Sequence, residues 1–313
     1  MKYMKQIKIP KLKEQEDLPI TIDGELRTLK TLPQLNGESF RHADDIKSSE
    51  TLLGMPFIPE VMSAIHKFLS HKTFEITLLT CCLKISEKQG PHLYELYTAA
   101  AKILGIDNPP DLYLTSDSGI APNACAYGLG PYFIIFNANF LMQFNEAETM
   151  AILGHELGHV KCNHMVAQTV ANFLFGMGGS LLSSFVPVLG TAAAKGMSQA
   201  AAYWSRCAEF TSDRAGLLVV QEPEIYAKAM AKLLGYKSRF LGEINFDAVI
   251  DQINQFEECD ENVMDSLRKM MFQSNIATSS HPLTAYRVVK ALQWGSSDQF
   301  NDILKGEYVR ELA

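Results

Sequence analysis

Residues 145–164 have the sequence NEAETMAILGHELGHVKCNH, which combines a helix start with two histidines and several acids. Asn145 is a suitable helix N-cap, because its side chain can accept a hydrogen bond from a free backbone N–H of the first turn. Glu146 and Glu148 follow in that turn, where the helix dipole favours negative charge. The stretch therefore predicts a helix that begins after Asn145.

Two histidines of this helix lie on one face. His155 and His159 are four residues apart, so their rings project about one turn from each other. Two neutral ring nitrogens at that spacing can reach one Zn²⁺ at about 2.0–2.1 Å. Glu156 is rotated by about 100° from His155, which places its carboxylate beside the metal, where it can take a proton from water. The alternative is a helix that happens to carry two histidines and an acid, so the rest of the sequence has to decide.

A catalytic zinc needs three protein ligands and an open position for water. The metzincin extension of the motif would require glycine at position 162 and histidine at 165, where this chain has Cys162 and Met165. That class of site is excluded. His164 falls about 180° from His155 around the helix, so we expect it to be a capping or surface residue near the helix end.

A better third ligand lies in SRCAEFTSDRAG, residues 205–216. Arg206, Glu209 and Asp213 are spaced at i, i+3 and i+7 and form one stripe of a second helix. The alternative is a solvated polar face with intrahelical ion pairs. Beside a zinc-type helix, we prefer Glu209 as the ligand and Asp213 as the acceptor of a ligating histidine's other N–H. Arg206 is then expected to neutralise the surplus negative charge.

Together these segments resemble the gluzincin metallopeptidases of the HtpX and CAAX-prenyl-protease type, metallopeptidase family 48. The matching segments are PNACAYG (122–128), HELGHVKCNH (155–164), SRCAEFTSDRAG (205–216) and SHPLTAYR (280–287). They follow the family's order, and the resemblance covers roughly residues 85–293. His-Glu-x-x-His alone is shared by many unrelated zincins, so the specificity comes from the four segments together.

The resemblance implies a site and a fold. One zinc ion per chain would be held by His155, His159 and Glu209, with Glu156 as general base. The implied fold is α+β, mainly α-helical and zincin-like (gluzincin), with a small β-sheet whose edge strand lines the cleft.

Four further residues take roles from the same resemblance. It places Asn123 and Ala124 on the strand that lines the cleft, and it associates His281 and Arg287 with transition-state stabilisation. The residues themselves support part of this. Pro282 suits the first position of a helix, so His281 would sit at a helix N-terminus, either as an oxyanion donor or as an ordinary capping histidine. The sequence weighs these two equally.

Composition limits the class of protein. The chain has 313 residues, of which 47% are hydrophobic and 20% charged, which excludes a disordered chain or one dense in spanning helices. The net charge of −7 argues against nucleic acid as a partner. The six cysteines form no C-x-x-C pair and are best explained as reduced thiols in the cytoplasm.

The chain is expected to divide into an N-terminal extension, residues 1–50, and a metallopeptidase domain, residues 51–313. A D-G turn in ITIDGELRTL predicts a hairpin in the extension, and the helical pattern begins at Ser49. Residues 165–205 contain one charge and predict an apolar helical hairpin. Peripheral membrane contact through this hairpin or the basic N-terminus is the less favoured alternative to a solvated strand and a packed hairpin.

Local patterns outside the motif helix place further elements. Helices are expected over residues 59–70 and 93–104, and strands over 111–115 and 132–137.

The sequence therefore predicts a zinc-dependent endopeptidase that hydrolyses peptide bonds with metal-activated water and a glutamate base. Expected partners are peptides and unfolded or membrane-protein substrates, and the resemblance adds a role in protein quality control. The location is expected to be cytoplasmic, with membrane association as the variant. The alternatives are a catalytically weak, zinc-binding chaperone-like protein and a peripheral membrane-associated protein.

Overall fold

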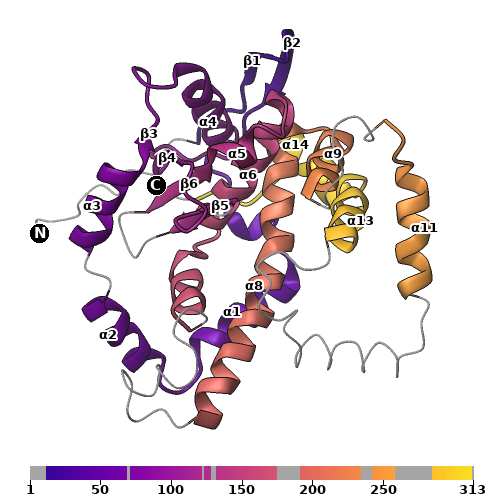
Figure 1. The fold of residues 1–313 in the computed structure, drawn as a ribbon. Coiled ribbons are helices and arrows are strands. Elements are labelled where there is room, and N and C mark those ends of the chain that lie inside the picture. The colour runs from indigo at the N-terminus through magenta and orange to yellow at the C-terminus, as the bar shows by residue number, and fades with distance from the viewer. Residues whose placement is uncertain are drawn as a thin grey trace, which may run out of the picture.

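The computed structural model describes residues 12–68, 71–121, 123–127, 132–174, 191–233, 242–257 and 284–311 (Figure 1). The helices are η1 (Gly37–Ser39), α1 (Ala43–Leu53), α2 (Ile58–Phe68), α3 (His71–Cys81), α4 (Pro91–Ile103), α5 (Ala138–Leu141), α6 (Glu146–Lys161), α8 (Thr191–Val220), α9 (Pro223–Leu233), α11 (Phe246–Glu257), α13 (Thr284–Gly295) and α14 (Asp298–Leu304). The strands are β1 (Asp17–Ile22), β2 (Glu25–Lys30), β3 (Leu83–Lys84), β4 (Asp111–Thr115), β5 (Ala124–Tyr127) and β6 (Phe133–Asn137). The predicted α+β, mainly helical architecture is confirmed.

A four-stranded sheet has the order β3-β4-β6-β5. Strands β4 and β6 are parallel, whereas β5 runs antiparallel to β6 and forms one edge. Side chains of β6 alternate between two cores: Ile134 and Phe136 join the main core, and Phe133 and Ile135 join a smaller cluster with Leu78 of α3. Both faces of the sheet are therefore covered, and the outer edge of β5 pairs with no other described strand.

Helices α6 and α8 pack against each other at unusually close range. A Cβ atom added at Gly158 would lie 2.6 Å from the Cβ of Ala215, and one added at Gly154 would lie 2.7 Å from Cγ2 of Val219. Because glycine has no side chain, the backbone of α6 can approach α8 more closely than any other residue would allow. This approach brings the motif helix against the helix that carries Glu209.

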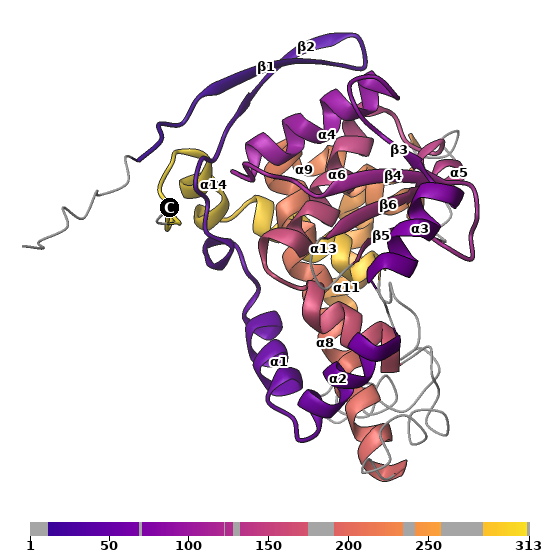
Figure 2. The same ribbon diagram turned by 90° about the vertical axis from the view of Figure 1, so that its left-hand side faces the viewer.

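The N-terminal segment combines a hairpin with a helix. Strands β1 and β2 pair antiparallel around the turn at Asp23 and Gly24, both with positive φ, as the D-G pattern predicts. Helix α1 begins at Ala43, earlier than the helical pattern suggests, with His42 as its N-cap. It packs on α8 (Figure 2).

The predicted apolar hairpin of residues 165–205 is described only in part. Residues 165–174 are helical and α8 begins at Thr191, but the turn between them lies outside the described residues. Within the described ranges, no helix has both the length and the apolar character needed to span a membrane.

Candidate active site

Helix α6 carries His155, Glu156 and His159, and its N-terminus is capped. The side chain of Asn145 accepts a hydrogen bond from the backbone N–H of Glu148, and the Glu148 carboxylate accepts one from the N–H of Asn145, which forms a capping box. Farther along the helix, His155, Glu156 and His159 are all buried. The cap and the packing against α8 fix the helix that orients them.

Three candidate metal ligands converge between α6 and α8. Suitable donor atoms of His155, His159 and Glu209 all lie within 4.8 Å of one another. Nε2 of His155 is 3.6 Å from Oε2 of Glu209, and Nε2 of His159 is 3.5 Å from Oε1. Both imidazole rings therefore point their Nε2 atoms toward the carboxylate of Glu209. The structure brings the three predicted ligands together.

The opposite nitrogen of His155 faces Asp213. Its Nδ1 is 3.2 Å from Oδ1 of Asp213, and the hydroxyl of Tyr226 donates to the same oxygen at 2.6 Å. Burial opposes protonation of His155, but the hydrogen bonds and charges of Asp213 and Glu209 raise its pKa to about 10. Asp213 thus lies where it was expected, as the partner of a candidate ligand's second nitrogen.

Arg287, and not Arg206 as the sequence predicts, supplies the positive charge beside Asp213 and Glu209. Its Nε and Nη2 donate to the two oxygens of Asp213 at 2.9 and 2.5 Å. Its Nη1 lies 2.8 Å from Oε2 of Glu209, an ion pair without hydrogen-bond alignment. Arg206 forms no ion pair with either carboxylate among the described residues, and burial lowers its pKa. The prediction for Arg206 is wrong because α13, distant in sequence, delivers the guanidinium.

His164 matches its prediction only in part. It is not a surface residue, because its side chain is only 1% exposed, but its backbone N–H donates to the carbonyl of His159 at 2.9 Å and so caps the end of α6. Its Nδ1 lies 3.1 Å from Nδ1 of His159, and its Nε2 lies 2.9 Å from Oδ2 of Asp45. Burial lowers the pKa of His164, although Asp45 acts in the opposite direction. Sequence reasoning missed Asp45 entirely.

The carboxylate of Asp45 is surrounded by donors. Nε of Arg41 and the hydroxyl of Thr211 each donate to Oδ2 at 2.8 Å, and the hydroxyl of Ser49 donates to Oδ1 at 3.1 Å. Burial alone would raise the pKa of Asp45, but hydrogen bonds and charges from His164 and Arg41 hold it well below its usual range. Asp45 is therefore an ionised acceptor in the interior.

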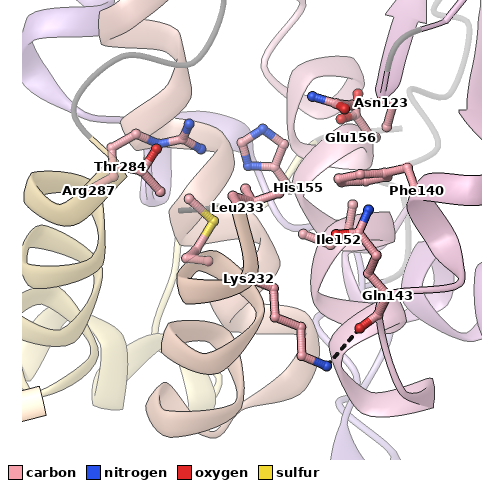
Figure 3. A pocket seen from close by; sticks show the side chains of 12 residues that line it. Asn123, Phe140, Gln143, Ile152, His155, Glu156, Lys232, Leu233, Thr284 and Arg287 are labelled. Carbon is pink, nitrogen blue, oxygen red and sulfur yellow. Dashed lines mark hydrogen bonds between the residues drawn. The ribbon is translucent and has the colours of Figure 1, made fainter. Parts of the chain in front are cut away.

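A cavity of about 260 Å³ opens beside the candidate ligands. Asn123 and Ala124, at the start of edge strand β5, line it together with His155 and Glu156 of α6, and Figure 3 shows the side chain of Asn123 next to that of Glu156. Arg287 projects into the cavity from α13. The remaining lining residues are Phe140, Gln143, Ile152, Met230, Lys232, Leu233 and Thr284. His281 lies outside the described residues.

The charges of the site suit a divalent cation. Three buried carboxylates, Glu156, Glu209 and Asp213, lie near one buried guanidinium, that of Arg287. Buried charge without compensation is costly, and a doubly charged ion would balance this surplus. Two imidazole nitrogens and one carboxylate oxygen form a donor set typical of divalent transition metals. With an acid next to the first histidine, this arrangement defines the class of metal-dependent hydrolases.

Comparison with known proteins identifies the family. The family model described as Peptidase family M48 matches residues 87–294. The plastoglobule-localized metallopeptidase 48 of Arabidopsis thaliana is 30% identical over 275 residues, which cover 87% of this chain and 76% of that protein. The chain therefore belongs to peptidase family M48, and it is a metallopeptidase.

Bacterial and archaeal relatives are more distant. A protein named protease HtpX homolog from Ralstonia pickettii is 24% identical over 238 residues, covering 69% of this chain and 78% of that protein. Protease HtpX homolog 2 from Methanosarcina acetivorans is 26% identical over 187 residues, covering 51% and 60%. No solved structure matches the chain significantly.

Proposed function

We propose that the protein is a zinc-dependent endopeptidase with one Zn²⁺ per chain, held by His155, His159 and Glu209. The observation that carries this proposal is the convergence of their donor atoms within 4.8 Å beside a cavity. Two histidines and a glutamate are a ligand set of catalytic zinc sites, which keep one position open. When bound, zinc lowers the pKa of water toward about 7 and polarises the substrate carbonyl.

Glu156 is the proposed general base. Its carboxylate lines the cavity next to His155, and it forms no hydrogen bond or ion pair with another described residue that would occupy it. It accepts the proton of the attacking water and transfers it to the nitrogen of the departing amine. Arg287 pairs with both Asp213 and Glu209 and holds them in place, and against the effect of burial its charge lowers the pKa of Asp213.

The substrate is proposed to bind as an extended chain along β5. Asn123 and Ala124 lie at the cavity where this edge strand begins, and its outer edge is unpaired among the described strands. An added strand forms main-chain hydrogen bonds, which gives binding with weak sequence preference. The apolar wall of the cavity, which includes Phe140 and Ile152, favours an apolar side chain. Unfolded polypeptides fit both features, which supports a role in protein quality control.

The decisive variant is Glu156→Gln, assayed on a denatured protein substrate. It should retain zinc and lose about 10²–10⁴-fold in rate, because the amide cannot accept the proton. Glu146→Gln, which alters a half-buried acid at the start of the same helix, outside the lining of the cavity, serves as the matched control. Glu209→Gln should weaken zinc binding. Wild-type cleavage by Glu156→Gln would refute the mechanism, and stoichiometric zinc at unchanged affinity in Glu209→Gln would refute that ligand.

Peripheral contact with a lipid surface is a second part of the proposal. The Arabidopsis relative carries "plastoglobule-localized" in its name, which supports peripheral contact of this chain with a lipid surface. Co-sedimentation with anionic liposomes tests this for the full chain and for a variant without residues 1–13. Binding lost on truncation would assign the contact to the basic N-terminus, and no binding by either protein would contradict it. No observation favours the chaperone-like alternative.

A further inference from the structure

The second ring nitrogen of each candidate histidine ligand is engaged differently. Nδ1 of His155 faces the carboxylate of Asp213 directly, at 3.2 Å. Nδ1 of His159 instead faces another imidazole, that of His164, at 3.1 Å. A carboxylate comes only after this extra ring, since Nε2 of His164 lies 2.9 Å from Oδ2 of Asp45. The three side chains His159, His164 and Asp45 form a buried row from the metal centre to helix α1.

The direction of the hydrogen bonds in this row follows from chemistry. An ionised carboxylate only accepts, so Nε2 of His164 must carry the proton it donates to Asp45. A neutral imidazole protonated at Nε2 has its lone pair on Nδ1. Nδ1 of His164 therefore accepts, and Nδ1 of His159 must be the donor. That leaves Nε2 of His159, the nitrogen that faces Glu209, with a free lone pair.

Helix α1 is firmly anchored where Asp45 needs to be. The helix packs on α8 in both views of the fold (Figures 1 and 2). Thr211 of α8 donates to Asp45, and its hydroxyl also accepts the backbone N–H of His42, which caps α1. Trp204, also on α8, donates from Nε1 to the hydroxyl of Ser49. These contacts hold the carboxylate against the helix that carries Glu209.

We propose that Asp45 and His164 are positioning residues of the metal centre, which fix the tautomer and orientation of His159 so that its Nε2 is available as a ligand. The inference rests on the proposed function, because it concerns the metal that His155, His159 and Glu209 would hold. Asp45 lies outside residues 87–294, the part that matches the family model. The N-terminal segment thus contributes Asp45, which orients a ligand of the metal centre, although it contributes no ligand itself.

The test uses the full-length chain with Asp45→Asn. The asparagine amide keeps an oxygen that accepts the Nε2–H of His164 but carries no charge, so it holds this proton more weakly than the carboxylate and fixes the tautomer of the row less firmly. Loss of such outer partners typically weakens metal affinity about 10–100-fold. We therefore expect a zinc dissociation constant raised by about that factor in a competition titration with a chromophoric chelator. The visible spectrum of the cobalt(II)-substituted protein should also change, which a purely structural role would not cause.

Two further variants make the result decisive. Ser49→Ala removes a donor to Asp45 and the acceptor of Trp204 but leaves the bond to His164, so it should lower the melting temperature without changing zinc affinity or the cobalt spectrum. His164→Leu removes the acceptor for His159 while Asp45 keeps its other donors. It should show the loss of affinity even if Asp45→Asn does not fold.

The outcomes separate this inference from the proposed function. If the wild-type chain binds no stoichiometric zinc, the proposed function fails. If the wild type binds zinc and the folded Asp45→Asn and His164→Leu variants bind it with the same affinity and the same cobalt spectrum, the function stands and this inference is overturned. A loss of affinity in Ser49→Ala equal to that in Asp45→Asn would also overturn it, because the effect would then follow from general loosening of α1.

Discussion

Replacing Gly158 by alanine adds one methyl group at the closest contact between α6 and α8. The added Cβ would lie 2.6 Å from the Cβ of Ala215 and 3.1 Å from the Cα of Ser212. Neither atom is the end of a flexible side chain, so no rotamer change can relieve the overlap. The two helices must therefore move apart at the level of the candidate metal ligands.

The size of the effect follows from these distances. Non-bonded carbon atoms pack at about 3.5–4.0 Å, so the helices would have to separate locally by about 1 Å. Metal–ligand distances tolerate only about 0.2 Å, and His155 and His159 lie on one of these helices and Glu209 on the other. Overpacking of this kind costs about 1–3 kcal/mol, which lowers Tm by several degrees at about 2–4 °C per kcal/mol.

Thermal unfolding of the metal-free chain and a zinc competition titration measure the two effects. Gly158→Ala should lower both Tm and zinc affinity. Gly196→Ala on α8 is the matched control, because nothing lies within 4 Å of its added Cβ and alanine favours the helix by about 0.5–1 kcal/mol. Unchanged Tm and zinc affinity in Gly158→Ala would refute the view that close helix packing assembles the site.

Three further variants alter charged or titratable side chains. Arg287→Met should lower the free energy of unfolding of the metal-free chain by about 3–5 kcal/mol, because it leaves two buried carboxylates uncompensated. Saturating zinc should restore part of this stability, and equal losses with and without zinc would contradict the prediction. Burial lowers the pKa of His42 below its ordinary value of 6.5, so the unfolded chain binds the proton more tightly and stability should fall as pH drops below about 6.5. His42→Asn, which can still cap α1, should reduce that fall in Tm between pH 7.5 and 5.5 relative to wild type. Lys232→Met breaks a buried ion pair with Glu148 and should lower the free energy of unfolding by about 3–5 kcal/mol. In a double-mutant cycle, the double variant Lys232→Met/Glu148→Gln should recover part of this loss. Losses that simply add would argue against an interaction between the two side chains.

Much of the candidate site could be inferred from local spacing. The i, i+4 pair His155 and His159 shares a helix face whatever the rest of the fold does, and Glu156 is adjacent to it. The cap at Asn145 is also a local signal, and the structure contains it. Glu209 and Asp213 lie one helical turn apart, so the prediction of Glu209 as a ligand also placed Asp213 close to the metal ligands. In each case the geometry depends only on the helical period.

Contacts between segments that are far apart in the sequence could not be predicted from the helical period. Arg206 and Arg287 are both buried arginines near the motif segments, and only the packing of α13 against α8 and α9 shows which of them reaches Glu209. His164 lies on the far side of a regular helix from His155, but α6 ends at Lys161 and the chain turns through Asn163, which has positive φ. That turn returns the ring of His164 to His159.

The class of chemistry follows from the order of the amino acids, because a metal-binding helix is defined by the identity and spacing of a few residues along one element. Only the folded chain shows that Arg287, His164 and Asp45 are the buried groups that join Asp213 in supporting those residues. Asp45 is 119 residues from His164, and no local pattern relates them. Their pairing depends on α1 docking on α8, and that docking depends on side-chain packing and buried hydrogen bonds between segments that are far apart in the chain.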